Sequence, residues 1–209
     1  MTALLLPARR KSASLPSSTR GEVDGLVAGV DEAGRGPWAG PVVAAAVVLV
    51  DVLPGLDDSK KLTAAVRERL FAALQTSARI GVGMASVAEI DALNIHWATM
   101  LAMERAVDAL GCAVDHVLVD GNRLPRWRHS ATAIVGGDAL CAAISAASII
   151  AKVTRDRLMA GLDADYPGYG WARNKGYGTA AHARGLAELG VNDHHRRSFA
   201  PVRARLARV

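Results

Sequence analysis

Apolar runs that end at glycines and acids organise the first half of the chain. Residues 26–30 are apolar and stop abruptly at Asp31 and Glu32, and a second apolar run, 42–50, follows a glycine-rich connection. Runs of this length between turn residues are typical of buried strands. Residues 78–86 form a third run of this kind, so the pattern predicts an antiparallel meander.

Helical periodicity begins after the second predicted strand. Thr63 is placed to cap a helix with apolar residues at every fourth position, and Ser86 with Glu89 has the spacing of a capping box. A longer helical stripe comprises Trp97, Met100, Met103, Val107 and Leu110. Short apolar runs at 116–119 and 131–135 predict two further strands. Hairpin strands followed by strands alternating with helices predict an α/β domain with a mixed central sheet flanked by helices.

Composition divides the chain into three parts. Residues 1–20, rich in Ser, Pro and Arg, predict a disordered basic leader, and residues 21–156 carry the predicted α/β domain. Residues 157–209 are rich in Gly, Tyr, Arg and His and predict a small helical C-terminal extension with a basic tail.

The net charge of +5 is concentrated at the two ends. Nine of the 25 basic residues lie in residues 1–20 and 194–209, which contain no acid, so residues 21–193 carry 16 basic and 20 acidic groups. Basic ends can attract nucleic acid to an acidic body whose carboxylates bind metal, or they can serve solubility alone. Charge leaves both interpretations open.

The chain has no run near the ~20 apolar residues that a membrane span requires. Cys112 and Cys141 are isolated in the sequence, which indicates free thiols rather than a disulfide or zinc site. No segment has the pattern of a secretory leader. We therefore expect a cytoplasmic protein that is monomeric and has no membrane contact.

Three aspartates share an unusual position, because each ends an apolar strand-like run near glycine: Asp31, Asp120 and Asp138. Any one of them alone is typical of a turn or a helix cap. Together they predict a cluster at the carboxyl ends of strands, where α/β sheets bind ligands. Glu32 joins this cluster only if its strand ends there, since neighbouring strand residues point to opposite faces.

Acids without histidine or cysteine indicate a hard cation, Mg²⁺ or Mn²⁺. Two such ions about 4 Å apart can clamp the attacking and leaving oxygens of a phosphodiester. Treated as a helix, the segment after Asp138 aligns a polar stripe with that acid, namely Ser145, Ser148, Lys152 and Arg155. Its opposite, buried face would comprise Leu140, Ile144, Ala147, Ala151 and Leu158. The stripe suits a phosphate backbone, or it is an ordinary solvated face.

Several motifs in this order resemble the ribonuclease HII family. Residues 29–37 read Gly-Val-Asp-Glu-Ala-Gly-Arg-Gly-Pro, and this block is highly specific in combination, whereas Gly34-x-Gly36 alone is weak. The resemblance covers about residues 26–202. It continues through 39–44, Asp58-Ser59-Lys60-Lys61-Leu62, Val119-Asp120-Gly121, Gly137-Asp138, 146–156, 174–179 and 195–202.

The resemblance implies a ribonuclease H-like fold, in which residues 21–156 form the catalytic domain. It implies that four acids hold the metal: Asp31, Glu32, Asp120 and Asp138. It further implies that the backbone amides of Gly34, Arg35 and Gly36 contact the ribose 2′-hydroxyl, that Tyr177 packs beside the sugar, and that Lys60, Ser148 and Lys152 touch phosphates. From the residues alone, the favoured interpretation of Tyr177 is a surface tyrosine packed on a neighbouring loop. Ala139 departs from the family, which often has serine after the fourth acid.

The expected function is that of an endoribonuclease with a nucleic-acid substrate. Such an enzyme hydrolyses the RNA strand of RNA–DNA hybrids and cuts 5′ of ribonucleotides embedded in duplex DNA, leaving 3′-hydroxyl and 5′-phosphate ends, as ribonucleotide excision repair requires. The alternatives are a DNA-directed nuclease of the same fold and a non-catalytic hybrid-binding module. A dinucleotide-binding oxidoreductase is rejected, because the third glycine of its motif is missing. His182, His194 and His195 are expected at the surface or near phosphate, and Trp38 in packing.

Overall fold

The computed structural model describes residues 25–207. The predicted basic leader, residues 1–20, and Arg208 lie outside the described residues. In the described part, no helix has the length and apolar character needed to cross a membrane.

A mixed five-stranded sheet forms the centre of the molecule, with the order β3-β2-β1-β4-β5. The strands are β1 (Val27–Ala33), β2 (Val42–Leu49), β3 (Ala78–Ala85), β4 (His116–Asp120) and β5 (Ala131–Ile134). The first three pair antiparallel, and β4 and β5 add in parallel beside β1. This confirms the predicted meander and mixed sheet, and it brings the carboxyl ends of β1, β4 and β5 to one edge.

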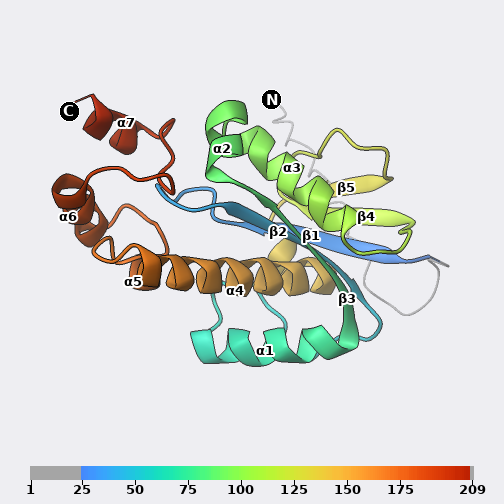
Figure 1. Ribbon diagram of the computed structural model, residues 1–209. Coiled ribbons are helices and arrows are strands. Elements are labelled where there is room, and N and C mark those ends of the chain that lie inside the picture. Colours follow the sequence, from blue (N-terminus) through green and yellow to red (C-terminus); the bar gives the residue numbers. More distant parts are fainter. Residues whose placement is uncertain (1–24, 208–209) are drawn as a thin grey trace, which may run out of the picture.

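Helices cover both faces of the sheet (Figure 1). One face carries α2 and α3, and the other carries the long helix α4 with α1 packed against it. Their bounds are α1 (Ala64–Ser77), α2 (Val87–Leu93), α3 (Ile95–Asp108), the 3₁₀ turn η1 (Gly137–Ala139) and α4 (Ala142–Asp165). Three short helices follow at one end of the molecule: α5 (Trp171–Asn174), α6 (Ala180–Leu189) and α7 (Ala200–Leu206). The predicted caps at Thr63 and Ser86 are present, the latter as a complete capping box with Glu89.

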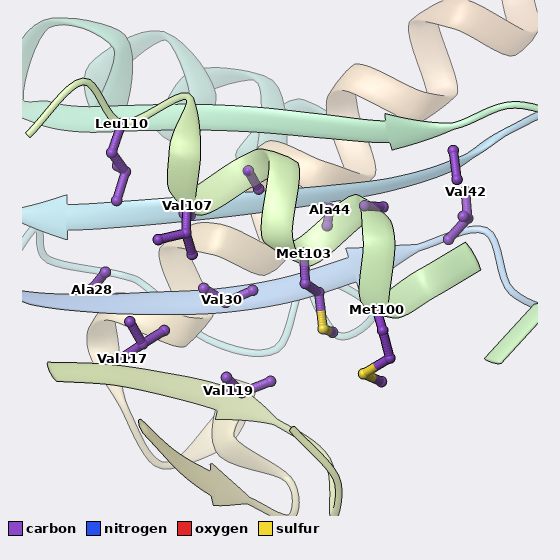
Figure 2. Packing of buried hydrophobic residues seen from close by; sticks show 14 of the residues in the cluster. Ala28, Val30, Val42, Ala44, Met100, Met103, Val107, Leu110, Val117 and Val119 are labelled. Carbon is purple, nitrogen blue, oxygen red and sulfur yellow. The ribbon is translucent and has the colours of Figure 1, made fainter. Parts of the chain in front are cut away.

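Strand β2 supplies apolar side chains to both layers because it is buried on both faces. Ala44, Ala46 and Val48 belong to the cluster under α3, whereas Ala45 and Val47 belong to the cluster under α1 and α4. Figure 2 shows the first cluster, with labelled side chains of α3 lying over those of β1 and β4. Burial of apolar side chains on both faces of the sheet is the main source of stability for this architecture.

A glycine in β1 lets α4 approach the sheet closely. A Cβ at Gly29 would lie 2.1 Å from the backbone carbon of Ala143, so any larger residue would push the helix away. Helix α4 therefore begins directly against the strand that carries Asp31. Two turns of this close packing bring the side chain of Ser148 into the same cleft as Asp31.

The prediction for the segment after Asp138 is wrong in three respects. Asp138 lies in η1, and α4 starts only at Ala142 and runs to Asp165. Leu140 and Leu158 are 60% and 37% exposed, so they do not belong to a buried face. The polar stripe is largely buried, since Ser145, Ser148 and Arg155 are each at most 3% exposed. Helix α4 lies between the sheet and the segment around α1, so it has little free surface. The domain boundary after residue 156 falls within α4 and stays a prediction.

Candidate active site

Three carboxylates meet at the edge where the parallel strands end. Asp31 lies near the end of β1, Asp120 is the last residue of the neighbouring strand β4, and Asp138 lies in η1 just after β5. One carboxylate oxygen from each lies within 4.8 Å of the other two. Asp31 and Asp138 are buried, and Asp120 is half-buried. The structure therefore brings together the three acids that the strand-end pattern indicated.

Glu32 reaches the same cleft from the next position of β1. The strand ends one residue later at Ala33, and Glu32 lines the cleft together with Asp31 and Asp120. Its carboxylate forms an ion pair with Arg35 at 3.3 Å, and its backbone N–H donates to Asp31 Oδ1 at 2.6 Å. It lies beside the three-aspartate cluster rather than within it.

The electrostatics of the cluster are unfavourable without a cation. Burial raises the pKa of Asp31 well above its ordinary value, and the neighbouring charges of Glu32 and Asp120 raise it further. Burial likewise raises the pKa of Asp138, with a further contribution from Asp120. Lys60 Nζ lies 3.7 Å from Asp138, but this lysine is largely exposed. A group of oxygen ligands this close fits a hard divalent cation, which would offset the repulsion.

The glycine-rich turn after β1 and Tyr177 form the wall of the cleft. Gly34 has a φ of 99°, a conformation that favours glycine, and a Cβ at Gly36 would lie 3.4 Å from Tyr177 Cε1. Tyr177 lies against the turn and is 46% exposed, so part of its side chain stays accessible in the cleft. The cleft has a volume of about 230 Å³ and includes all three turn residues.

The predicted phosphate contacts differ in accessibility. Lys60 and Lys152 line the cleft, and Lys152 pairs with Asp156 at 2.8 Å. Ser148 also lines the cleft, but it is 3% exposed, and its hydroxyl hydrogen-bonds the hydroxyl of Ser59 at 2.7 Å. Sequence reasoning gave Ser59 no role of its own, because a serine between charged residues reads as a surface position.

A smaller hollow adjoins the acids on the other side. It is lined by Glu32, Asp120 and Arg123 among others and has a volume of about 130 Å³. The β4–β5 loop that borders it exposes Arg123, Arg126 and Arg128, and Arg126 lies over the ring of Trp97 at 4.6 Å. This loop therefore presents three exposed arginines, of which Arg123 shares the hollow with Glu32 and Asp120, and it provides positive charge in a body that is otherwise mildly acidic.

Two histidines expected at the surface are fully buried. His182 and His195 face each other, with their Nε2 atoms 3.1 Å apart, and His182 Nε2 accepts a hydrogen bond from Trp171 Nε1 at 3.2 Å. Burial lowers the pKa of His182, and it lowers that of His195 to about 4. The expectation was wrong because the extension forms a small aromatic core of its own. Trp38 packs against this pair, as expected.

Two arginines were misread in the sequence. Arg155 was placed on the polar stripe and Arg196 in the basic tail, yet both are buried and donate to backbone carbonyls of the turn region. Arg205 likewise donates to the carbonyls of Leu186 and Ala187 at the end of α6. Much of the predicted basic tail is therefore committed to internal contacts.

Comparison with known proteins agrees with this geometry. The family model "Ribonuclease HII" matches residues 28–202. The ribonuclease HII of Rhizorhabdus wittichii is 62% identical over 178 residues, covering 84% of this chain and 88% of the relative. That of Sphingopyxis alaskensis is 61% identical, covering 85% and 90%. The crystal structure of ribonuclease H2 from Pyrococcus horikoshii is similar with a TM-score of 0.71 and 30% identity, covering 87% of this chain and 97% of that one.

A mixed sheet with clustered acids at its parallel strand ends defines a metal-dependent hydrolase of the ribonuclease H fold. Within that class, the chain belongs to the ribonuclease HII family, whose members are endoribonucleases. A manganese complex of a ribonuclease HIII shares the fold at a TM-score of 0.71 and 18% identity. The DNA-directed and non-catalytic alternatives are not favoured.

Proposed function

We propose that this chain hydrolyses the RNA strand of RNA–DNA hybrids and cuts on the 5′ side of a single ribonucleotide in duplex DNA. The products would carry 3′-hydroxyl and 5′-phosphate ends. The observation that carries the proposal is one cleft lined both by Asp31, Glu32 and Asp120, with the Asp138 carboxylate beside them, and by the turn of Gly34, Arg35 and Gly36. The acids suit phosphodiester hydrolysis, and the turn suits recognition of a ribose.

Asp31, Asp120 and Asp138 would hold Mg²⁺ or Mn²⁺, with Glu32 completing the set from the edge of the cluster. When bound, such cations stabilise the charge that develops on the phosphate and activate a water molecule. Strand pairing sets the positions of Asp31 and Asp120, and Asp138 lies in the 3₁₀ turn η1, whose Gly137 N–H donates to Asp120 Oδ1 at 2.7 Å. Rigid placement matters because small displacements of reacting groups cost orders of magnitude in rate.

The backbone N–H groups of the turn would contact the 2′-hydroxyl, the group that distinguishes RNA from DNA. Tyr177 would pack beside the sugar, since it already lies against Gly36 and part of its side chain stays accessible in the cleft. Lys60 and Lys152 would bind the flanking phosphates, and Ser148 would contribute from the base of the cleft. Ala139 lacks the hydroxyl that family members often have there, so one phosphate hydrogen bond would be missing.

We further propose that the enzyme works as a monomer in the cytoplasm. Cys112 and Cys141 are both free, which is compatible with a reducing compartment.

The test is a cleavage assay on a labelled duplex that contains one ribonucleotide, run beside its all-DNA twin and resolved at single-nucleotide resolution. With Mg²⁺ we expect one cut, 5′ of the ribose, and no cut in the twin. A chelator should abolish cleavage. Equal cutting of both duplexes, or cutting 3′ of the ribose, would contradict the proposal and favour a general DNA nuclease.

A further inference from the structure

The turn that reads the ribose in the proposed function rests on a buried guanidinium. Arg196 is fully buried, and its Nη2 donates to the carbonyl oxygen of Gly34 at 2.6 Å. Its Nη1 donates to the carbonyl oxygen of Arg35 at 2.9 Å, and its Nε donates to that of Gly40 at 2.9 Å. One side chain from the C-terminal extension therefore fixes two successive peptides of the turn.

Because the peptide group is planar, these two hydrogen bonds also determine where the N–H groups of Arg35 and Gly36 point. In a trans peptide the C=O and N–H groups point in opposite directions, and the described residues contain no cis peptide. Holding the Gly34 carbonyl on the buried side points the N–H of Arg35 away from Arg196. Holding the Arg35 carbonyl does the same for the N–H of Gly36.

The two amides are also free to bind a ligand. Within residues 25–207, neither the N–H of Arg35 nor that of Gly36 has an internal acceptor. Both residues line the cleft that contains the acids. Arg35 and Gly36 are both exposed, so water satisfies these two adjacent donors in the free enzyme, and a substrate oxygen in the cleft can replace that water.

A second buried cation prevents the turn from relaxing inward. Arg155 Nε donates to the carbonyl oxygen of Pro41 at 2.9 Å, and its Nη1 donates to that of Lys175 at 2.9 Å. A Cβ at Gly34 would lie 1.9 Å from Arg155 Nε, so the guanidinium lies directly beneath the turn. The turn therefore lies between the guanidinium groups of Arg155 and Arg196. Any displacement of the turn would break several of their hydrogen bonds to backbone carbonyls at once.

Neither guanidinium forms an ion pair with a carboxylate in the part of the chain described. Burial lowers the pKa of Arg155 to about 10 and that of Arg196 to about 9, so both remain protonated at neutral pH. Their positive charge is met by carbonyl dipoles and, for Arg196, also by the ring of Phe199, whose centroid lies 5.1 Å from the guanidinium carbon. This arrangement polarises the peptides of the turn and strengthens their N–H groups as donors toward an oxygen in the cleft.

We propose that Arg196 is a positioning residue that sets the preference for ribose, because it orients the N–H groups of Arg35 and Gly36 toward the 2′-hydroxyl. The inference rests on the proposed function, since it assumes that these amides read the sugar. It adds a residue from the far end of the chain, which touches no substrate and acts only through the turn.

The test measures binding preference as well as rate. Arg196→Lys keeps the charge but cannot donate to the Gly34 and Arg35 carbonyls with a fork of the same geometry. Dissociation constants are measured by fluorescence anisotropy for a duplex with one ribonucleotide and for its deoxy twin, with Ca²⁺ in place of Mg²⁺ to stop turnover. Arg205→Lys is the matched control, because Arg205 lies in α7 and also donates to two backbone carbonyls, but these belong to α6 and not to the turn.

We expect Arg196→Lys to weaken binding of the ribonucleotide duplex about tenfold, the equivalent of one to two ordinary hydrogen bonds, while binding of the deoxy twin is unchanged. The single-turnover cleavage rate should fall with it, and Arg205→Lys should keep the wild-type preference. If Arg196→Lys weakens both duplexes equally, or keeps the preference, the residue is merely structural and the inference fails. If the wild type itself has no preference, the proposed function fails instead.

A measurement on the wild type covers the case in which Arg196→Lys does not fold. Amide hydrogen exchange at Arg35 and Gly36, followed by NMR, should be fast in the free enzyme. The ribonucleotide duplex should slow it strongly, and the deoxy twin should slow it less. Slow exchange at both amides in the free enzyme would overturn the inference, because the N–H groups would then be bonded internally.

Discussion

Replacing Asp31 with asparagine should stabilise the metal-free protein and remove the stabilisation that metal provides. Asp31 is 4% exposed, and one of its oxygens lies within 4.8 Å of carboxylate oxygens of Asp120 and Asp138. At an effective dielectric of about 20, two charges at that distance repel by roughly 3 kcal/mol. Because Asp120 is half-exposed, solvent screens part of this repulsion. We therefore expect the substitution to raise the free energy of unfolding of the metal-free protein by about 2 kcal/mol. Asparagine keeps the oxygen that accepts the N–H of Glu32.

The sign of the pH dependence follows from the raised pKa of Asp31. In the metal-free wild type this carboxyl binds its proton more tightly in the folded than in the unfolded state, so its contribution to stability is present at acidic pH. That contribution is lost as the pH rises through the pKa of the folded state. The asparagine variant cannot titrate at this position, so its melting temperature should depend less on pH in this range.

The assay is thermal unfolding in a chelator and in Mg²⁺. In the chelator, about 2 kcal/mol should raise the melting temperature by roughly 5 °C for a chain of this size. With Mg²⁺ at 100 times its dissociation constant, the wild type should gain about 2.7 kcal/mol and the variant almost nothing, so the order of the two reverses. Asp51→Asn, at an exposed position, is the control and should change neither value. A variant that melts below the wild type in the chelator, or responds normally to Mg²⁺, would refute the reasoning.

The turnover of Asp31→Asn should fall at least about 100-fold, as it should for Asp120→Asn and Asp138→Asn.

The remaining predictions concern the cleft wall, the basic surface and the buried histidines. Tyr177→Ala should lower the cleavage rate at a single ribonucleotide about tenfold while duplex binding changes less, and equal losses in both would contradict its place beside the sugar. The double variant Arg126→Gln, Arg128→Gln should reduce the slope of log K against log salt by about 1.8 if each arginine neutralises one phosphate, whereas Arg205→Gln should leave the slope unchanged. His195 has its pKa lowered to about 4 by burial, so its contribution to stability is lost as the pH falls from about 6.5 through 4. A His195→Gln variant should flatten this acid limb in pH-dependent melting curves, and an unchanged limb would assign it to other groups.

The strands and the acid cluster were predictable because local pattern determines them. An apolar run that ends in an acid near glycine marks the end of a buried strand, and parallel strands end at the same edge. Asp31, Asp120 and Asp138 therefore converge as the sequence predicted. Glu32 was uncertain from alternation alone, and its place was settled by where β1 ends.

The buried arginines were not predictable, because their partners are distant in the sequence. Arg196 bonds carbonyls about 160 residues away, and nothing in its neighbourhood distinguishes it from the exposed Arg197. Helical periodicity placed Arg155 correctly on the side of α4 that bears Ser148, but periodicity cannot say that this side is covered. Only the packing of the C-terminal extension on the turn decides it.

The C-terminal extension contributes to the cleft although it carries none of the acids, since Tyr177 lines the cleft and Arg196 supports the turn. Strand pairing positions Asp31 and Asp120, and the short turn η1 directly after β5 positions Asp138. The turn after β1, which we propose contacts the ribose, has no such support of its own, because it leaves the sheet at Gly34 with a positive φ and has two amides without an acceptor among residues 25–207. Two residues from beyond α4 contact that turn. Arg196 donates to its carbonyls from the buried side, and Tyr177 packs against Gly36 on the cleft side. In the proposed function, hydrolysis would therefore depend on the acids at the sheet edge, whereas selectivity for ribose would depend on contacts between the turn after β1 and the C-terminal extension.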